Sequence, residues 1–155
     1  MKNTLFLIAI LFLSFSGMAQ TVSFEDPNLT KSYTSYLNLK DALVLADSKS
    51  AKQSAEELKA SLAKTPDSKK ALAKVNQFIG ASSVKEQRTV FSALSNEIIA
   101  LVKSAKIISG EFYVAFCPMA NQNSGGFWLS NQKEIKNPYF GKMMLSCGSV
   151  KETFN

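Results

Sequence analysis

The chain has 155 residues, a formal net charge of +6, two cysteines and no histidine. This length suits one domain with one hydrophobic core, because domains most often run to about 100 to 150 residues. The lack of histidine excludes Ser-His-Asp and Cys-His nucleophilic sites, the usual catalytic zinc sites and haem attachment through Cys-x-x-Cys-His within this chain. We therefore expect a protein that is not an enzyme.

The positive charges are scattered along the sequence, with Lys69-Lys70 as the only adjacent basic pair. Proteins that bind nucleic acid usually gather lysine and arginine on one face or in one block. The distribution predicts a solvated surface and no nucleic-acid partner.

The first 19 residues have the layout of a cleavable signal peptide. Lys2 gives a positive start, an apolar run extends from Leu5 to Leu13, and small and polar residues lead to Ala19. The run is shorter than the ~20 residues that span a bilayer. We expect cleavage after Ala19 and a periplasmic protein with no transmembrane anchor afterwards, in which residues 20–155 form a single domain with a net charge of +5 once Lys2 is lost.

Four helices are expected over about residues 27–108. Each begins with a side chain that can accept a hydrogen bond from the free N-terminal amides, or with a proline in the first turn. In chain order these signals are Asp26-Pro27, Ser50 with Gln53, Thr65-Pro66, and Ser83 with Glu86. Gly80 is expected to end the third helix in a left-handed conformation. Short connections favour antiparallel neighbours, so the predicted fold is mainly α, an antiparallel four-helix up-and-down bundle.

Lys40 falls within the apolar stripe of the first helix. Lysine side chains often bury their methylene groups and extend the ammonium group to water, and we expect this of Lys40. A buried functional lysine is the alternative.

Residues 110–155 change from a helical to an alternating pattern, with Phe112, Val114 and Phe116 on one side of a predicted strand. This segment contains both cysteines, the only tryptophan and three of the five methionines. Short strands and loops after a helical bundle make the predicted class α+β overall. The residues with distinctive chemistry are concentrated in this last third.

Four C-terminal motifs are similar to those of a known family: CPMA at 117–120, GFWLS at 126–130, IKNPYFG at 135–141 and MLSCG at 144–148. A looser similarity extends to residues 36–43 and 86–95. On these motifs the chain resembles the bacterial domain-of-unknown-function family 3347. The resemblance implies a non-enzymatic envelope domain, found alone or fused to periplasmic adaptor subunits of heavy-metal efflux systems, often copper-related.

The chain departs from that family in one respect. Many of its members carry histidine and methionine in the third helical region, where this chain has Leu72, Val75 and Asn76. A source of metal ligands implied by the resemblance is therefore missing here.

The candidate metal ligands are the sulfur atoms of Cys117, Cys147, Met119 and Met144. Thiolate and thioether sulfur are soft ligands that suit Cu(I). Zinc is disfavoured, because a closed structural site needs four strong ligands and the chain offers two cysteines and no histidine. Only one of Met143 and Met144 could face Cys117, because adjacent residues of a strand point to opposite faces, and Met144 is the one taken as a candidate.

A disulfide between Cys117 and Cys147 is the alternative interpretation. Two cysteines in an exported protein commonly pair, and closing this loop would stabilise the fold by roughly 3 to 4 kcal/mol. The methionines would then be adaptable packing against aromatic rings. Two functions remain open: an accessory domain that binds soft metal and acts with a periplasmic efflux component, and a disulfide-stapled interaction module without metal.

Overall fold

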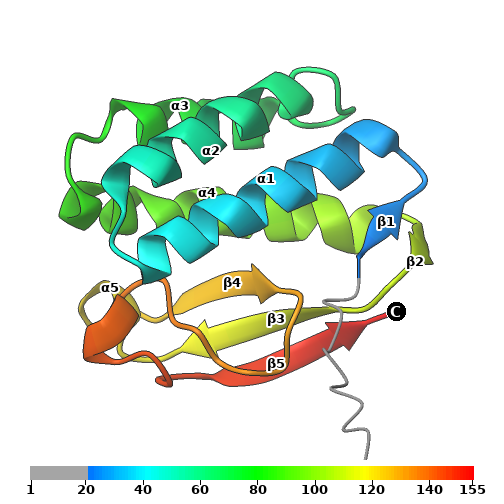
Figure 1. The fold of residues 1–155 in the computed structure, drawn as a ribbon. Helices are drawn as coiled ribbons and strands as arrows, with labels where there is room; N and C mark the ends of the chain where they lie inside the picture. Colours follow the sequence, from blue (N-terminus) through cyan, green and yellow to red (C-terminus); the bar gives the residue numbers. More distant parts are fainter. Residues whose placement is uncertain (1–20) are drawn as a thin grey trace, which may run out of the picture.

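The computed structural model describes residues 21–155, so the predicted signal peptide and its cleavage site lie outside the described residues. Figure 1 shows three layers: a sheet, a middle pair of helices above it, and an outer pair on the far side. The middle pair is α1 (Pro27–Val44) and α4 (Val84–Ser104), and the outer pair is α2 (Ser48–Leu62) and α3 (Lys69–Gly80). The fold is α+β, as the sequence predicts.

Two antiparallel sheets accompany the helices. The larger has the order β4-β3-β5, with β3 (Phe112–Cys117) between β4 (Gly126–Ser130) and β5 (Ser149–Phe154). The smaller pairs β1 (Ser23–Phe24) with β2 (Ile107–Ser109). The strand predicted at residues 112–117 is confirmed, and it is the central strand of its sheet.

Two short elements lie in the connections of the larger sheet: α5 (Ala120–Asn123) and the 3-10 helix η1 (Gly141–Met143). Gly141, at φ +58°, turns the chain into η1 beside the carbonyl of Val44. Met143 ends η1 and Met144 follows it, so the prediction that these two methionines lie on a strand is wrong.

The helix starts predicted at Asp26 and Ser83 are confirmed. Asp26 accepts a hydrogen bond from the N–H of Asn28 at 2.8 Å, and the hydroxyl of Ser83 accepts one from the N–H of Glu86 at 3.2 Å. The carboxylate of Glu86 accepts from both the N–H and the hydroxyl of Ser82, each at 2.8 Å. Local hydrogen bonds between side chains and the main chain thus fix the N-terminal ends of α1 and α4, the two helices of the middle layer.

The other two predicted helix starts are wrong. The cap of α2 is Asp47, which accepts from the N–H of Ser50 at 3.0 Å. The helix α3 begins at Lys69, because the hydroxyls of Thr65 and Ser68 donate to carbonyls of α2 and make residues 63–68 a closing turn of that helix.

The third helix also ends differently from the prediction. Gly80 is its last residue, and it is not in a left-handed conformation. The helix stops because Ala81 turns to an extended conformation, with its N–H donating to the carbonyl of Phe78.

Aromatic side chains join the helical layers to the sheets in one core. The rings of Phe24, Tyr33 and Phe112 lie 5.6 to 6.0 Å apart and bring together β1, α1 and β3. The ring of Phe91 in α4 lies 5.4 Å from that of Tyr139. Rings of this size contribute much of the apolar surface that folding buries.

A fully buried tyrosine connects the helices to the sheet by hydrogen bonds. The hydroxyl of Tyr36 in α1 lies 2.6 Å from that of Ser95 in α4 and accepts a hydrogen bond from the N–H of Leu129 in β4. Burial raises the pKa of Tyr36, so its hydroxyl stays protonated and can donate to Ser95.

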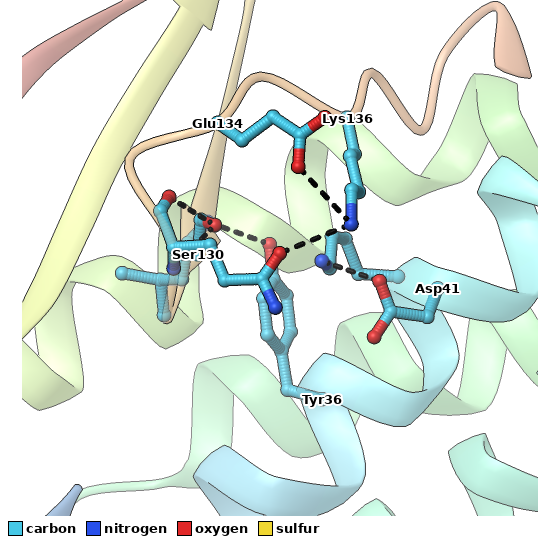
Figure 2. Close-up of polar contacts among 8 residues, drawn as sticks. Tyr36, Asp41, Ser130, Glu134 and Lys136 are labelled. Atoms are coloured by element: carbon cyan, nitrogen blue, oxygen red, sulfur yellow. Dashed lines mark hydrogen bonds and ion pairs between the residues drawn. The ribbon is translucent and has the colours of Figure 1, made fainter. Parts of the chain in front are cut away.

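The segment after β4 lies over this part of α1 (Figure 2), where Lys136 pairs with Glu134 at 3.4 Å. Lys40 is 3% exposed and its ammonium group pairs with the carboxylate of Asp41 at 2.5 Å. The prediction that Lys40 extends its charge to water is therefore wrong, and an adjacent carboxylate compensates the buried charge instead.

Among residues 21–155, none of the helices combines the length and the apolar character needed to cross a bilayer.

Candidate functional site

Cys117 is held by the regular hydrogen bonding of the larger sheet. It is the last residue of β3, lies opposite Gly126 of β4 and is fully buried. The same ladder fixes the preceding residue, Phe116, between Phe127 and Ser149. The thiol of Cys117 therefore has a well-defined position on the central strand.

Cys147 lies in the connection between η1 and β5 and is half-buried. Its N–H donates to the carbonyl of Met144 at 3.1 Å. Although the two residues are 30 positions apart in the sequence, they lie at the same end of the β3–β5 pair, because Phe116 is paired with Ser149 there. Over the residues that the structure describes, both are free thiols.

The contact between the two thiols changes the acidity of the outer one. The hydrogen bond with Cys117 raises the pKa of Cys147 above its ordinary value, because it favours the protonated form. Burial and the charge of a Cys117 thiolate act in the same direction, while the N–H of Met119 acts in the opposite one. The pair therefore keeps its outer proton more firmly than an isolated cysteine does.

The structure brings the main chain of two predicted methionine ligands next to Cys147. The N–H of Met119 lowers the pKa of the Cys147 thiol, and the carbonyl of Met144 accepts a hydrogen bond from the Cys147 N–H at 3.1 Å. The Met119 side chain is 47% exposed, Met144 is half-buried, and Met143 is 76% exposed. Met119 and Met144 are thus placed beside Cys147 by their main chain.

The ligand set of the site is limited to sulfur. Within residues 21–155, no group of three or more His, Cys, Asp or Glu is arranged to hold a metal ion. A tetrahedral site built from four such ligands therefore does not fit these residues. Two thiols at the same end of a strand pair fit a soft ion that accepts few ligands.

Aromatic rings pack closely against the main chain beside both cysteines. The sequence alone did not reveal this packing. A Cβ atom on Gly126 would lie 2.5 Å from the Tyr139 ring, and one on Gly148 would lie 2.8 Å from the Trp128 ring. Trp128 is 1% exposed and belongs to the core. The glycines allow the main chain on both sides of the cysteines to approach these rings.

A shallow groove of about 460 Å³ lies elsewhere, between α1 and α2. Its lining includes Thr34, Asn38, Glu57 and Lys64, with no cysteine or methionine. It offers no chemistry comparable with that of the two thiols.

A family model described as "Protein of unknown function (DUF3347)" matches residues 32–110 of the chain. The match takes in most of α1, all of α2, α3 and α4, and strand β2, and it ends before Cys117. No curated protein and no solved structure was found to match. The family match covers just over half of the sequence, and the chain belongs to the DUF3347 family.

Proposed function

We propose that this chain is a non-enzymatic accessory domain of the cell envelope that binds one soft metal ion of the Cu(I) type through Cys117 and Cys147. The observation that carries the proposal is that the β3–β5 ladder, which pairs Phe116 with Ser149, places these two cysteines, 30 positions apart, at the same end of the strand pair, where the Cys117 side chain acts on the Cys147 thiol. Two thiolates so close together suit a soft monovalent ion better than a hard one. The domain would support heavy-metal efflux or homeostasis.

The surroundings of Cys147 support this choice of ion. Met119 and Met144 follow Cys117 and precede Cys147 closely in the sequence, and the main chain of both lies beside Cys147. Met143 lies one position further from Cys147 than Met144 and is more exposed. The described residues offer no cluster of His, Asp or Glu that would favour a harder ion. The inner thiol is buried and the outer one is half-buried, so an ion would enter from the Cys147 side.

The proposal places the domain in the periplasm, where a component of an efflux system would be its partner. The signal-peptide pattern at residues 1–19 and the envelope setting implied by the sequence resemblance support this location. The short connections between the four helices favour an antiparallel up-and-down bundle as the scaffold. Residues 20–155 would act as a single domain.

Metal binding can be tested by titrating the reduced protein with Cu(I) under anaerobic conditions against a chromophoric competitor. We expect one equivalent to be bound, with binding lost in Cys117→Ser and Cys147→Ser and weakened in Met119→Leu. Met143→Leu is the matched control, because this exposed methionine should leave the affinity unchanged. A wild-type protein that takes up no Cu(I), or a Cys147→Ser variant that binds it fully, would contradict the proposal.

A disulfide between the same two cysteines is the second candidate, and the same contact favours it. The bond would tie the connection that contains Cys147 to strand β3 and make the protein a metal-free interaction module. Protein isolated from the envelope would then show no free thiol. Full reaction with a thiol reagent without prior reduction would count against this candidate.

A further inference from the structure

The two cysteines are positioned by different means. Cys117 is fixed by the ladder that joins β3 to β4 and β5. Cys147 belongs to no helix or strand, so other contacts must hold its thiol beside Cys117. One side chain that bonds to this segment lies ten residues earlier, after β4.

Asn137 is fully buried and bonds to the Cys147 segment at two points. Its side-chain nitrogen Nδ2 donates to the carbonyl of Cys147 at 2.8 Å, and its main-chain N–H donates to the carbonyl of Leu145 at 2.9 Å. These bonds place residues 145 and 147 relative to Asn137.

The other end of the same carboxamide is also occupied. Its oxygen Oδ1 accepts from the N–H of Tyr139 at 2.8 Å and from that of Phe140 at 3.3 Å. An amide group with its oxygen on two N–H donors must direct its nitrogen to the opposite side, toward Cys147. The turn after Asn137 therefore sets the orientation of the bond to Cys147.

Tyr139 connects this turn to the strand pair that carries the other thiol. Its hydroxyl donates to the carbonyl of Phe127 at 2.7 Å, and Phe127 follows Gly126, which lies opposite Cys117. A continuous set of contacts thus runs from one cysteine to the other through Tyr139 and Asn137.

We propose that Asn137 is the positioning residue that holds the thiol of Cys147 against that of Cys117. The inference rests on the proposed function, because it concerns the same pair of thiols. Asparagine suits the role: aspartate keeps the accepting oxygens but has no N–H to donate, and serine is too short to reach the Cys147 carbonyl while it still caps the turn.

The equilibrium between the two thiols and their disulfide gives the effective concentration of one thiol at the other. This quantity measures the positioning without any metal. In a glutathione buffer, two protein thiols and one oxidised glutathione give the protein disulfide and two reduced glutathiones, so atoms and electrons balance. We expect Asn137→Asp and Asn137→Ser each to lower the effective concentration by about tenfold, which corresponds to the loss of one buried hydrogen bond. Circular dichroism would confirm that the variants are folded.

Asn121→Asp is the matched control. It removes the same kind of bond, from Nδ2 of Asn121 to the carbonyl of Gly125 at 2.8 Å, in the turn after Cys117. Its effective concentration should stay within twofold of that of the wild type.

Equal values for the wild type and the Asn137 variants would overturn the proposal. So would an equal fall in the Asn121 control, or loss of folding in both Asn137 variants, since Asn137 would then have only a general structural role. If the protein bound no Cu(I) but the Asn137 variants still showed a tenfold lower effective concentration, only the proposed metal function would be refuted.

Discussion

Gly148 allows the chain to pass close to the aromatic wall directly after Cys147. Its φ is +133°, a conformation that side chains disfavour, and a Cβ atom there would lie 2.8 Å from both the Phe116 carbonyl oxygen and the Trp128 ring. The position of Cys147 is thus set from one side by Asn137 and from the other by this close approach.

Gly148→Ala should lower the free energy of unfolding by about 1 to 3 kcal/mol, because both the backbone conformation and the added methyl group are strained. The measurement is urea unfolding followed by circular dichroism. Gly80→Ala is the control, since a Cβ at this helix-ending residue meets nothing within 4 Å and should be neutral or slightly stabilising. Equal stability of the two variants would show that the main chain beside Cys147 is not tightly packed.

Cys117→Ala should lower the pKa of Cys147. The substitution removes the hydrogen bond and the thiolate charge that raise it, and leaves the N–H of Met119 that lowers it. The alkylation rate of Cys147, followed by mass spectrometry from pH 7 to about 10, should reach its midpoint at a lower pH than in the wild type. Met143→Leu should leave the midpoint in place. An unchanged or higher midpoint in Cys117→Ala would mean that the two thiols do not interact.

At the scale of elements, the start of α4 contains a titratable capping interaction. The N–H and hydroxyl of Ser82 donate to the Glu86 carboxylate and hold its pKa below the ordinary value of 4.5. A carboxyl group whose pKa is lower in the folded than in the unfolded state stabilises the fold at pH values above its pKa in the unfolded state. That contribution is lost as the pH falls through the folded pKa.

Glu86→Gln should therefore flatten the acid limb of the stability profile. Wild type and variant should differ most at neutral pH and converge as the pH falls below about 4. Urea midpoints measured across this range test the prediction, with Glu56→Gln on the exposed face of α2 as the control. A gap between Glu86→Gln and the wild type that stays constant with pH would contradict it.

The elements that sequence reasoning identified are those that local interactions define. Asp26 and Ser83 cap their helices with residues two and three positions away, so their patterns were sufficient. Thr65-Pro66 has the same pattern but belongs to the end of α2, because Thr65 donates back to Ser61. The pair of β1 and β2 was missed, since each strand is short and its partner lies more than 80 residues away.

The candidate site stays a prediction, and the sequence could indicate its residue types but not what positions them. The sequence identified Cys117, Cys147 and the flanking methionines by residue type, and the structure brings the two cysteine side chains together. Their contact depends on Asn137, whose buried bonds reach ten residues along the chain. An Asn-Pro pair indicates a turn, and nothing in the sequence indicates which carbonyl its side chain binds.

At the scale of the whole molecule, Tyr36 connects the middle pair of helices, α1 and α4, to strand β4 of the larger sheet. Tyr36→Phe would remove its contacts with Ser95 and with the N–H of Leu129. Buried groups left without partners typically cost about 1 to 3 kcal/mol each, so we expect a loss of at least about 1 kcal/mol in unfolding free energy.

Tyr33→Phe provides a matched control in the same helix. The Tyr33 hydroxyl is buried and has no hydrogen-bond partner among residues 21–155. Its removal should leave the stability unchanged or raise it slightly, as measured by the same urea unfolding. The account of the core would be wrong if Tyr33→Phe were as destabilising as Tyr36→Phe.

The central claim is that Cys117 and Cys147 together form one soft-metal site. Native mass spectrometry of the protein isolated anaerobically from the cell envelope tests it most directly. We predict a chain that carries one copper ion and becomes metal-free, with two reduced thiols, when the ion is removed by a chelator. A metal-free chain two hydrogens lighter than the reduced form would instead show a disulfide and contradict the claim.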